Sequence, residues 1–255
     1  MVAAPGVASR MSIDASNGAR PAPTTTPGRP EKPTHANRFR LDYREEALAM
    51  GPPPCPILDV HTHVNGERAS VIYREARDLF GITATWSMSR LDEAPVIRKN
   101  LGDTVRFIAV PNFMGSDRLH AHTQGFLDDI RRWHGEFGSR IVKFWTAPRA
   151  VDYAEEAGDP ALLRLDSPWR RRQMELATDL GMVIMAHIAD PDTWFATKYK
   201  DASRYGSKAE QYVALERLGA EFTQPWILAH MGGWPEDLDF LDGLLTRRPN
   251  FYLDS

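Results

Sequence analysis

The sequence contains a single cysteine, Cys55, so no disulfide can form within the chain. This excludes the small disulfide-stapled scaffolds of secreted proteins, and it is typical of a reducing compartment. We therefore expect a cytoplasmic protein. Because a lone thiol more often packs than reacts, we also expect Cys55 to be buried at the entry to the first strand.

Long apolar runs are absent as well. None approaches the roughly 18 to 20 residues of a membrane span, and the N-terminus lacks the apolar centre of a signal peptide. The formal net charge of -3 provides no excess of positive charge for binding nucleic acid or an anionic membrane. The sequence predicts a soluble protein whose partner is a small molecule, and it leaves a homo-oligomer open.

Large apolar side chains are scarce in the first fifty residues, which are rich in Ala, Pro, Ser, Thr and Gly. Prolines interrupt any helix there, at Pro21, Pro23, Pro27, Pro30 and Pro33. Such a composition cannot bury enough apolar surface to offset the entropy of ordering. We predict a disordered tail over residues 1–50 and one folded domain over residues 51–255.

Short apolar runs then alternate with stretches of helical periodicity, which is the signature of repeated βα units and a parallel sheet. Strands are expected at 57–61, 82–87, 104–110, 140–145, 182–187, 225–230 and 250–254. Helices are expected at about 67–80, 92–101, 123–137, 168–180, 208–220 and 236–247. Ser167 and Pro168 are typical of a helix start. Gly81, Gly181 and Gly219 are expected to end helices in the left-handed conformation.

Seven strands are visible where a TIM-type (β/α)₈ barrel has eight. Such a barrel takes around 250 residues, and only about 200 follow the predicted tail. An open sheet would leave the first and seventh strands as unpaired edges. We therefore predict an α/β fold of the (β/α)₈ barrel type that is incomplete at its C-terminus.

Histidines follow three of the predicted strands. His61 and His63 are two residues apart at the end of the first strand, and His187 and His230 each close a later apolar run. Carboxyl ends of barrel strands meet on one face, where barrel enzymes place their active sites. Imidazoles converging there can hold a metal ion. A further pair, His120 and His122, precedes a helix in a polar stretch and is rejected as a metal site.

The chain resembles the amidohydrolase superfamily of metal-dependent hydrolases, in the group typified by aminocarboxymuconate semialdehyde decarboxylase. The motifs that carry the resemblance are LDVHTHV, AHIAD, AHMGGWPEDL and NFYLDS, spread over roughly residues 55 to 255. The resemblance implies that His61, His63 and His187 bind one divalent metal, and that His230 is the catalytic acid/base. Zinc is favoured, with manganese, cobalt and iron as alternatives.

The family also takes a metal-binding aspartate from its eighth strand, which is not visible here. Asp254 is a candidate replacement, although the resemblance assigns it to the seventh strand, one βα unit too early. Lys143 ends the fourth strand, where some relatives carry a carbamylated lysine between two metals. A contact to a substrate carboxylate, or a pairing with a neighbouring acid, is the favoured role for Lys143.

The rim of the predicted barrel offers candidates for substrate binding. These are Lys143, Trp145, Arg149 and Trp194. Residues 188–207 form an unusually long connection after the fifth strand, with Lys198, Lys200 and Arg204. Long connections on this face often grip substrates, so a carboxylate-bearing substrate is one interpretation, and a solvated charged loop is the other.

These features predict a metal-dependent hydrolase that cleaves an ester, lactone or amide bond of a small organic acid through a metal-activated water. The alternative within the same family is metal-dependent, non-oxidative decarboxylation of an aromatic or unsaturated acid. A third interpretation is an inactive or incomplete barrel fragment, because the eighth strand and its aspartate are missing.

Overall fold

The structure is a computed structural model that describes residues 32–33 and 37–255. The chain divides into two compact units, Met1–Ala49 and Met50–Ser255. Most of the predicted disordered tail lies outside the described residues. Its last part does not fit the prediction, because residues Tyr43–Met50 form helix α1.

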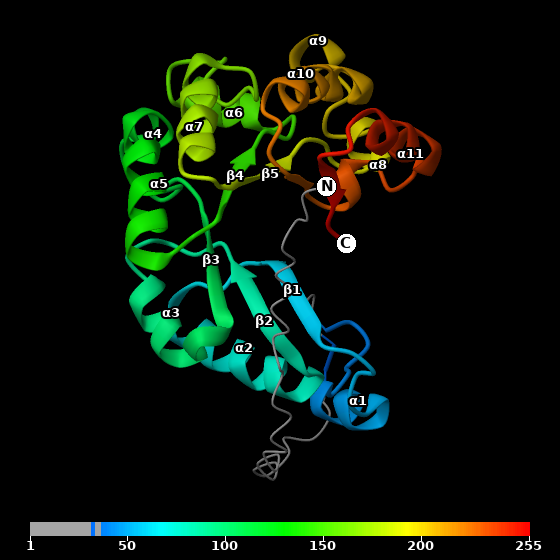
Figure 1. The fold of residues 1–255 in the computed structure, drawn as a ribbon. Coiled ribbons are helices and arrows are strands. Elements are labelled where there is room, and N and C mark those ends of the chain that lie inside the picture. Colours follow the sequence, from blue (N-terminus) through cyan, green and yellow to red (C-terminus); the bar gives the residue numbers. More distant parts are fainter. Residues whose placement is uncertain (1–31, 34–36) are drawn as a thin grey trace, which may run out of the picture. The chain divides into compact units, whose positions relative to one another are not determined.

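The second unit contains seven parallel strands in the order β1-β2-β3-β4-β5-β6-β7. They are β1 Ile57–Thr62, β2 Ile82–Ser87, β3 Val105–Ala109, β4 Ile141–Trp145, β5 Val183–His187, β6 Trp226–Leu228 and β7 Phe251–Leu253. The sheet curls into a half-barrel whose edge strands are β1 and β7 (Figure 1). All seven predicted strands are therefore confirmed, with ends that differ by two residues at most.

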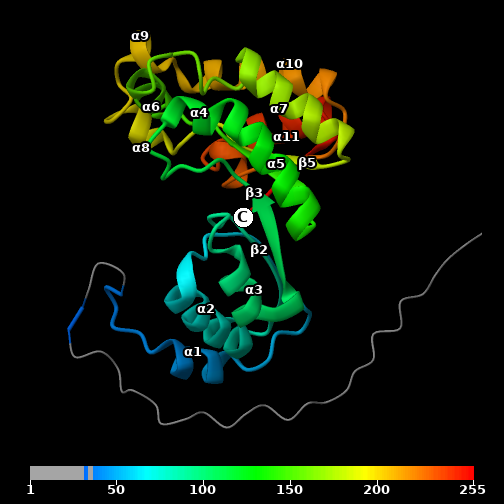
Figure 2. The ribbon, with the colours of Figure 1, turned by 90° about the vertical axis from the view of Figure 1, so that its left-hand side faces the viewer.

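Helices cover the outer face of the sheet, as the views in Figures 1 and 2 show for α2, α3, α5 and α7. The predicted helices are present as α2 Gly66–Phe80, α3 Ala94–Leu101, α5 Gln124–Phe137, α7 Pro168–Asp179, α10 Lys208–Glu221 and α11 Leu238–Arg247. Short helices that the sequence did not predict are α4 Arg118–His122, α6 Ala150–Glu156, α8 Asp192–Phe195 and α9 Ala202–Tyr205. Each lies in a connection near the carboxyl ends of the strands.

Three of the predicted helix boundaries illustrate what local sequence can and cannot determine. Ser167 caps α7 by accepting a hydrogen bond from the Arg170 backbone N–H, and Gly81 ends α2 with φ 72°. Gly219, however, does not end a helix. It lies inside α10, where an added Cβ would be 2.2 Å from the Phe251 ring, so its missing side chain lets α10 pack against β7.

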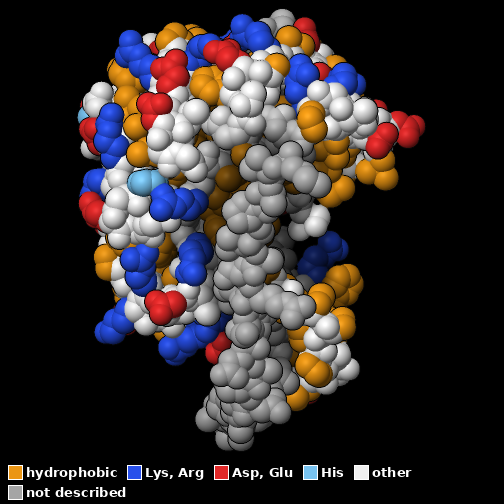
Figure 3. All heavy atoms as spheres, viewed as in Figure 1, with side chains coloured by type: hydrophobic (Ala, Val, Ile, Leu, Met, Phe, Trp, Pro, Cys, Tyr) orange, Lys and Arg blue, Asp and Glu red, His pale blue; other side chains and the backbone are white. Residues whose placement is uncertain are grey.

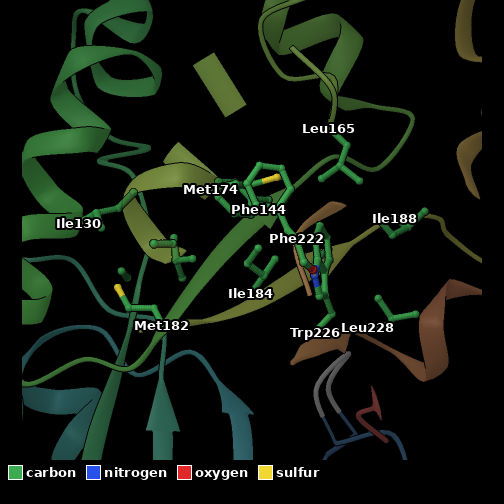
Figure 4. Packing of buried hydrophobic residues seen from close by; sticks show 14 of the residues in the cluster. Ile130, Phe144, Leu165, Met174, Met182, Ile184, Ile188, Phe222, Trp226 and Leu228 are labelled. Atoms are coloured by element: carbon green, nitrogen blue, oxygen red, sulfur yellow. The ribbon is translucent and has the colours of Figure 1, made fainter. Parts of the chain in front are cut away.

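The hydrophobic core lies between the sheet and its helices. Figure 4 shows Phe144, Ile184, Trp226 and Leu228 packed there, and all four are fully buried. Their alternation along β4, β5 and β6 sends the intervening side chains toward the inside of the curl. Cys55 takes no part in this core. It is exposed, so the prediction of a buried thiol is wrong.

No helix in the described part of the chain is both long and apolar enough to cross a membrane. Acidic and basic side chains lie next to each other along the upper part of the face in Figure 3. Ion pairs such as Arg204 with Asp152 and Glu155 are of this kind. Arg204 is thus paired with neighbouring acids.

Candidate active site

The four histidines singled out in the sequence form one cluster at the carboxyl ends of the strands. His61 belongs to β1, His63 follows it, His187 ends β5, and His230 lies just beyond β6. The His61 ring centroid is 5.8 Å from that of His63 and 4.9 Å from that of His230, and the centroids of His187 and His230 are 4.5 Å apart. Three separate strands therefore deliver imidazoles to one place.

The end of β1 is fixed by hydrogen bonds to the segment after β2. The Met88 backbone N–H donates to the Thr62 carbonyl at 2.8 Å, and the Val64 N–H donates to the Ser87 hydroxyl at 3.0 Å. Asp59 also stabilises β1. It accepts a hydrogen bond from the Tyr73 hydroxyl on α2 at 2.6 Å and one from the His61 backbone N–H at 3.2 Å. Asp59 therefore holds the backbone of His61 and not its ring.

His230 has an unusual backbone conformation. Its φ is 58° and that of Met231 is 53°, so two consecutive residues with side chains occupy the left-handed region. Such a residue costs of the order of 1–3 kcal/mol unless its surroundings hold it in place. Here Asp254 does so: its carboxylate accepts a hydrogen bond from the His230 N–H, and its carbonyl accepts one from the Met231 N–H.

Asp254 also begins a hydrogen-bonded chain through the cluster. Its Oδ2 is 2.6 Å from His61 Nδ1, and Nε2 of the same ring is 2.6 Å from Lys143 Nζ. A carboxylate accepts and a lysine amine can donate, so these contacts suit a His61 ring that donates from Nδ1 to Asp254 and accepts at Nε2 from Lys143. The structure thus places Asp254, which directly follows β7, in the cluster.

Burial and neighbouring charges shift the pKa values in this cluster. Burial, followed by the influence of His187 and Lys143 nearby, lowers the pKa of His230 to about 4. Burial also lowers the pKa of His63. The pKa of Lys143 falls to about 7 because of burial, against the opposing influence of Asp254. His230 is therefore a neutral imidazole at neutral pH, able to accept a proton.

A cavity of about 950 Å³ opens onto this cluster. Among the predicted site residues, His63, His187, His230, Lys143 and Trp145 line it. His61, Asp254, Arg149 and Trp194 do not. Arg149 instead precedes α6 with its guanidinium 5.5 Å from the Tyr153 ring centroid, and Trp194 lies in α8, where it carries Lys198 over its ring at 3.4 Å.

Sequence reasoning missed a second set of lining residues, which comes from the segments after β1, β2 and β3 and from α5. It consists of an apolar set and a polar set: Met88, Leu91, Val110, Pro111, Phe113 and Met114, with Asn65, Arg90, Asn112, Asp129 and Arg132. Position after a predicted strand was the only available signal for Met88, Arg90, Asn112 and Phe113. The cavity lining therefore combines imidazoles with apolar side chains and with arginine and amide groups.

The cluster has the donor chemistry of a metal site. Imidazoles with a carboxylate suit zinc and other divalent transition ions, and burial favours the neutral imidazole form that binds them. Within the described ranges, no group of three or more His, Cys, Asp or Glu side chains is arranged so that it could hold a metal ion as it stands. His61 presents Nε2 to Lys143 and Nδ1 to Asp254, so a metal can use His61 Nε2 only after the ammonium has moved.

Comparison with known proteins adds no assignment. No family model and no curated protein sequence matches the chain.

Proposed function

We propose that this chain is a metal-dependent hydrolase of the amidohydrolase type, built on an incomplete TIM-type barrel. It acts on an ester, lactone or amide bond of a small organic acid. The observation that supports this proposal is the meeting of the His61, His63, His187 and His230 rings at the carboxyl ends of the strands, where the last three line a cavity of about 950 Å³.

His61, His63 and His187 would hold one divalent ion, with zinc favoured and Asp254 as a further candidate ligand. When bound, such an ion acts as a Lewis acid and lowers the pKa of water toward neutrality. The protein's own residues complete the chemistry. His230, neutral because of its low pKa, accepts a proton and returns it to the leaving group, while Trp145 and Phe113 offer apolar walls for the substrate.

Metal analysis and assay of the purified chain test the proposal. We expect it to bind about one equivalent of zinc and to hydrolyse members of a panel of esters, lactones and amides of small carboxylic acids. A chelator should abolish this activity, and zinc should restore it. Release of carbon dioxide with loss of a carboxylate would instead identify a decarboxylase, and absence of both metal and turnover would identify an inactive barrel.

Single substitutions separate the proposed roles. His61→Ala and His187→Ala should lose bound zinc, because each removes an imidazole ligand. His230→Ala should keep zinc and lower kcat by about 10²- to 10⁴-fold, the usual contribution of a general acid/base. His120→Ala, which removes an exposed histidine of α4, serves as the control and should change neither quantity. Equal zinc loss in all three site variants would contradict this division of roles.

A further inference from the structure

Asp190 connects one histidine of the cluster to the long segment after β5. Its Oδ1 is 3.1 Å from His187 Nε2, and its Oδ2 accepts a hydrogen bond from the Tyr199 hydroxyl at 2.9 Å. Both Asp190 and Tyr199 are buried, with 8% and 4% of their surfaces exposed. These contacts are therefore shielded from water. Hydrogen bonds to a carboxylate are stronger in such a buried environment than in water.

The two contacts determine the arrangement of protons. The Tyr199 hydroxyl donates to one carboxylate oxygen of Asp190, and the His187 ring contacts the other. An ionised carboxylate only accepts hydrogen bonds, so both partners must donate. His187 then carries its proton on Nε2, and the lone pair of its ring is on Nδ1.

Tyr199 itself packs against three aromatic side chains of the same segment. Its ring centroid is 5.5 Å from that of Phe195 and 6.1 Å from that of Trp194 in α8, and 5.2 Å from that of Tyr205 in α9. Residues 192–205 thus pack around the tyrosine whose hydroxyl bonds Asp190. The conformation of this segment and the orientation of the His187 ring are linked through two hydrogen bonds.

From this geometry we infer that Asp190 is a positioning residue that fixes the tautomer and orientation of His187, so that Nδ1 is the nitrogen offered to a metal ion or ligand. Tyr199 supports it from the segment after β5. Neither residue touches the reacting atoms. The inference rests on the proposed function for the role of His187, but the tautomer itself follows from the hydrogen bonds alone.

The tautomer can be measured directly in the metal-free full chain. Labelling of histidine with ¹⁵N and long-range ¹H–¹⁵N correlation separate protonated from unprotonated ring nitrogens, and a His187→Gln spectrum identifies the His187 signals among the eight histidines. We expect His187 to be protonated on Nε2. Asp190→Ala should give a mixture of tautomers, whereas Asp190→Asn, which keeps a carbonyl acceptor, should largely preserve the original one.

Zinc affinity gives the second readout, measured by competition with a chromophoric chelator. Loss of a carboxylate that orients a metal-binding histidine typically costs 10- to 100-fold in affinity, and we expect this for Asp190→Ala. Tyr199→Phe keeps the ring packing and should cost less than 10-fold. Asp201→Asn, a change in the same segment at a residue that caps α9, should have no effect.

Two results would overturn the inference: a wild-type His187 protonated on Nδ1, or an Asp190→Ala variant with unchanged tautomer and zinc affinity. If Asp190→Ala does not fold, Asp190→Leu, which fills the site but has no acceptor oxygen, provides the same comparison against Asp190→Asn. A wild-type chain that binds no zinc would refute the proposed function but not the assignment of Asp190, because the tautomer measurement would then decide it alone.

Discussion

At the scale of single residues, Asp254 makes the contacts that define the site most directly. It accepts hydrogen bonds from the His61 ring and from the His230 backbone, so it orients one imidazole and holds the left-handed turn that presents another. Removing a buried acceptor leaves its donors unsatisfied, which costs about 1–3 kcal/mol. We expect Asp254→Ala to lower the free energy of unfolding of the metal-free chain by about this amount, measured in urea.

The comparison for this prediction is Asp242→Ala. Asp242 is an exposed aspartate of α11, and its removal should change stability by less than about 0.5 kcal/mol. Asp254→Asn keeps an acceptor oxygen and should fall between the two. Equal stability of Asp254→Ala and Asp242→Ala would show that the contacts to His61 and His230 do not stabilise the fold.

His122 makes the stability of the fold depend on pH. Burial, with the positive charges of Arg170 and Arg118, lowers its pKa in the folded state from 6.5 to about 3. Between these values the unfolded chain binds a proton that the folded chain does not. Protons therefore favour the unfolded chain as the pH falls. The free energy of unfolding is at its full value above about pH 6.5 and decreases progressively as the pH falls toward 3.

A His122→Phe variant isolates this effect, because phenylalanine cannot take up the proton. Between about pH 7.5 and about pH 5.0, the wild type should lose about 2 kcal/mol more stability than the variant, at 1.36 kcal/mol per pKa unit. Urea unfolding of both proteins at the two pH values gives the comparison. Parallel losses would mean that His122 is protonated as readily in the folded chain as in the unfolded one.

At the scale of elements, the packing of α10 on β7 depends on Gly219. Helix propensity alone predicts that Gly219→Ala stabilises α10 by up to about 1 kcal/mol. The added methyl would lie 2.2 Å from the Phe251 ring, which is itself buried, and overpacking of this kind costs about 1–3 kcal/mol. We expect net destabilisation, visible as a lower urea midpoint.

Gly135→Ala in α5 is the matched control. It has no atom within 4 Å of the added Cβ, so propensity should act without opposition and raise the midpoint. If both substitutions stabilise the protein, Phe251 moves aside at little cost and α10 is not locked onto β7.

The same glycine shows why some elements could be predicted from the sequence and others could not. The strands were predictable because buried parallel strands are short, continuous apolar runs such as that before His187. Gly219 looks like a helix end locally, and only its neighbour on β7 explains its position. Helices α8 and α9 have four residues each, too few for a helical periodicity to appear in the sequence.

In the candidate site, too, some features could be predicted from the sequence and others could not. The clustering of His61, His187 and His230 could be predicted, since carboxyl ends of parallel strands meet on one face of the sheet. The contacts of Lys143 with His61 and of Asp190 with His187 could not, because they depend on how far each side chain reaches across the curled sheet. Such distances have no signature in a linear sequence.

At the scale of the whole second unit, the edge strands β1 and β7 approach each other at the site. Each has one neighbouring strand in the sheet, yet His61 on β1 and Asp254 after β7 are 2.6 Å apart. An ion held by His61, His63 and His187 would in addition join β1 to β5. A ligand that binds only the folded chain stabilises all of it, by about 2.7 kcal/mol at a free concentration 100 times its Kd.

We therefore expect zinc at that concentration to raise the Tm by roughly 5–10 °C, since 1 kcal/mol corresponds to about 2–4 °C in a domain of this size. Thermal unfolding with and without zinc measures the shift, with magnesium as the control ion, because magnesium prefers oxygen ligands. His61→Ala should abolish the shift, and His230→Ala should retain it. A shift of equal size in His61→Ala would mean that zinc binds away from the cluster, and the joining of β1 to β5 through a metal would be wrong.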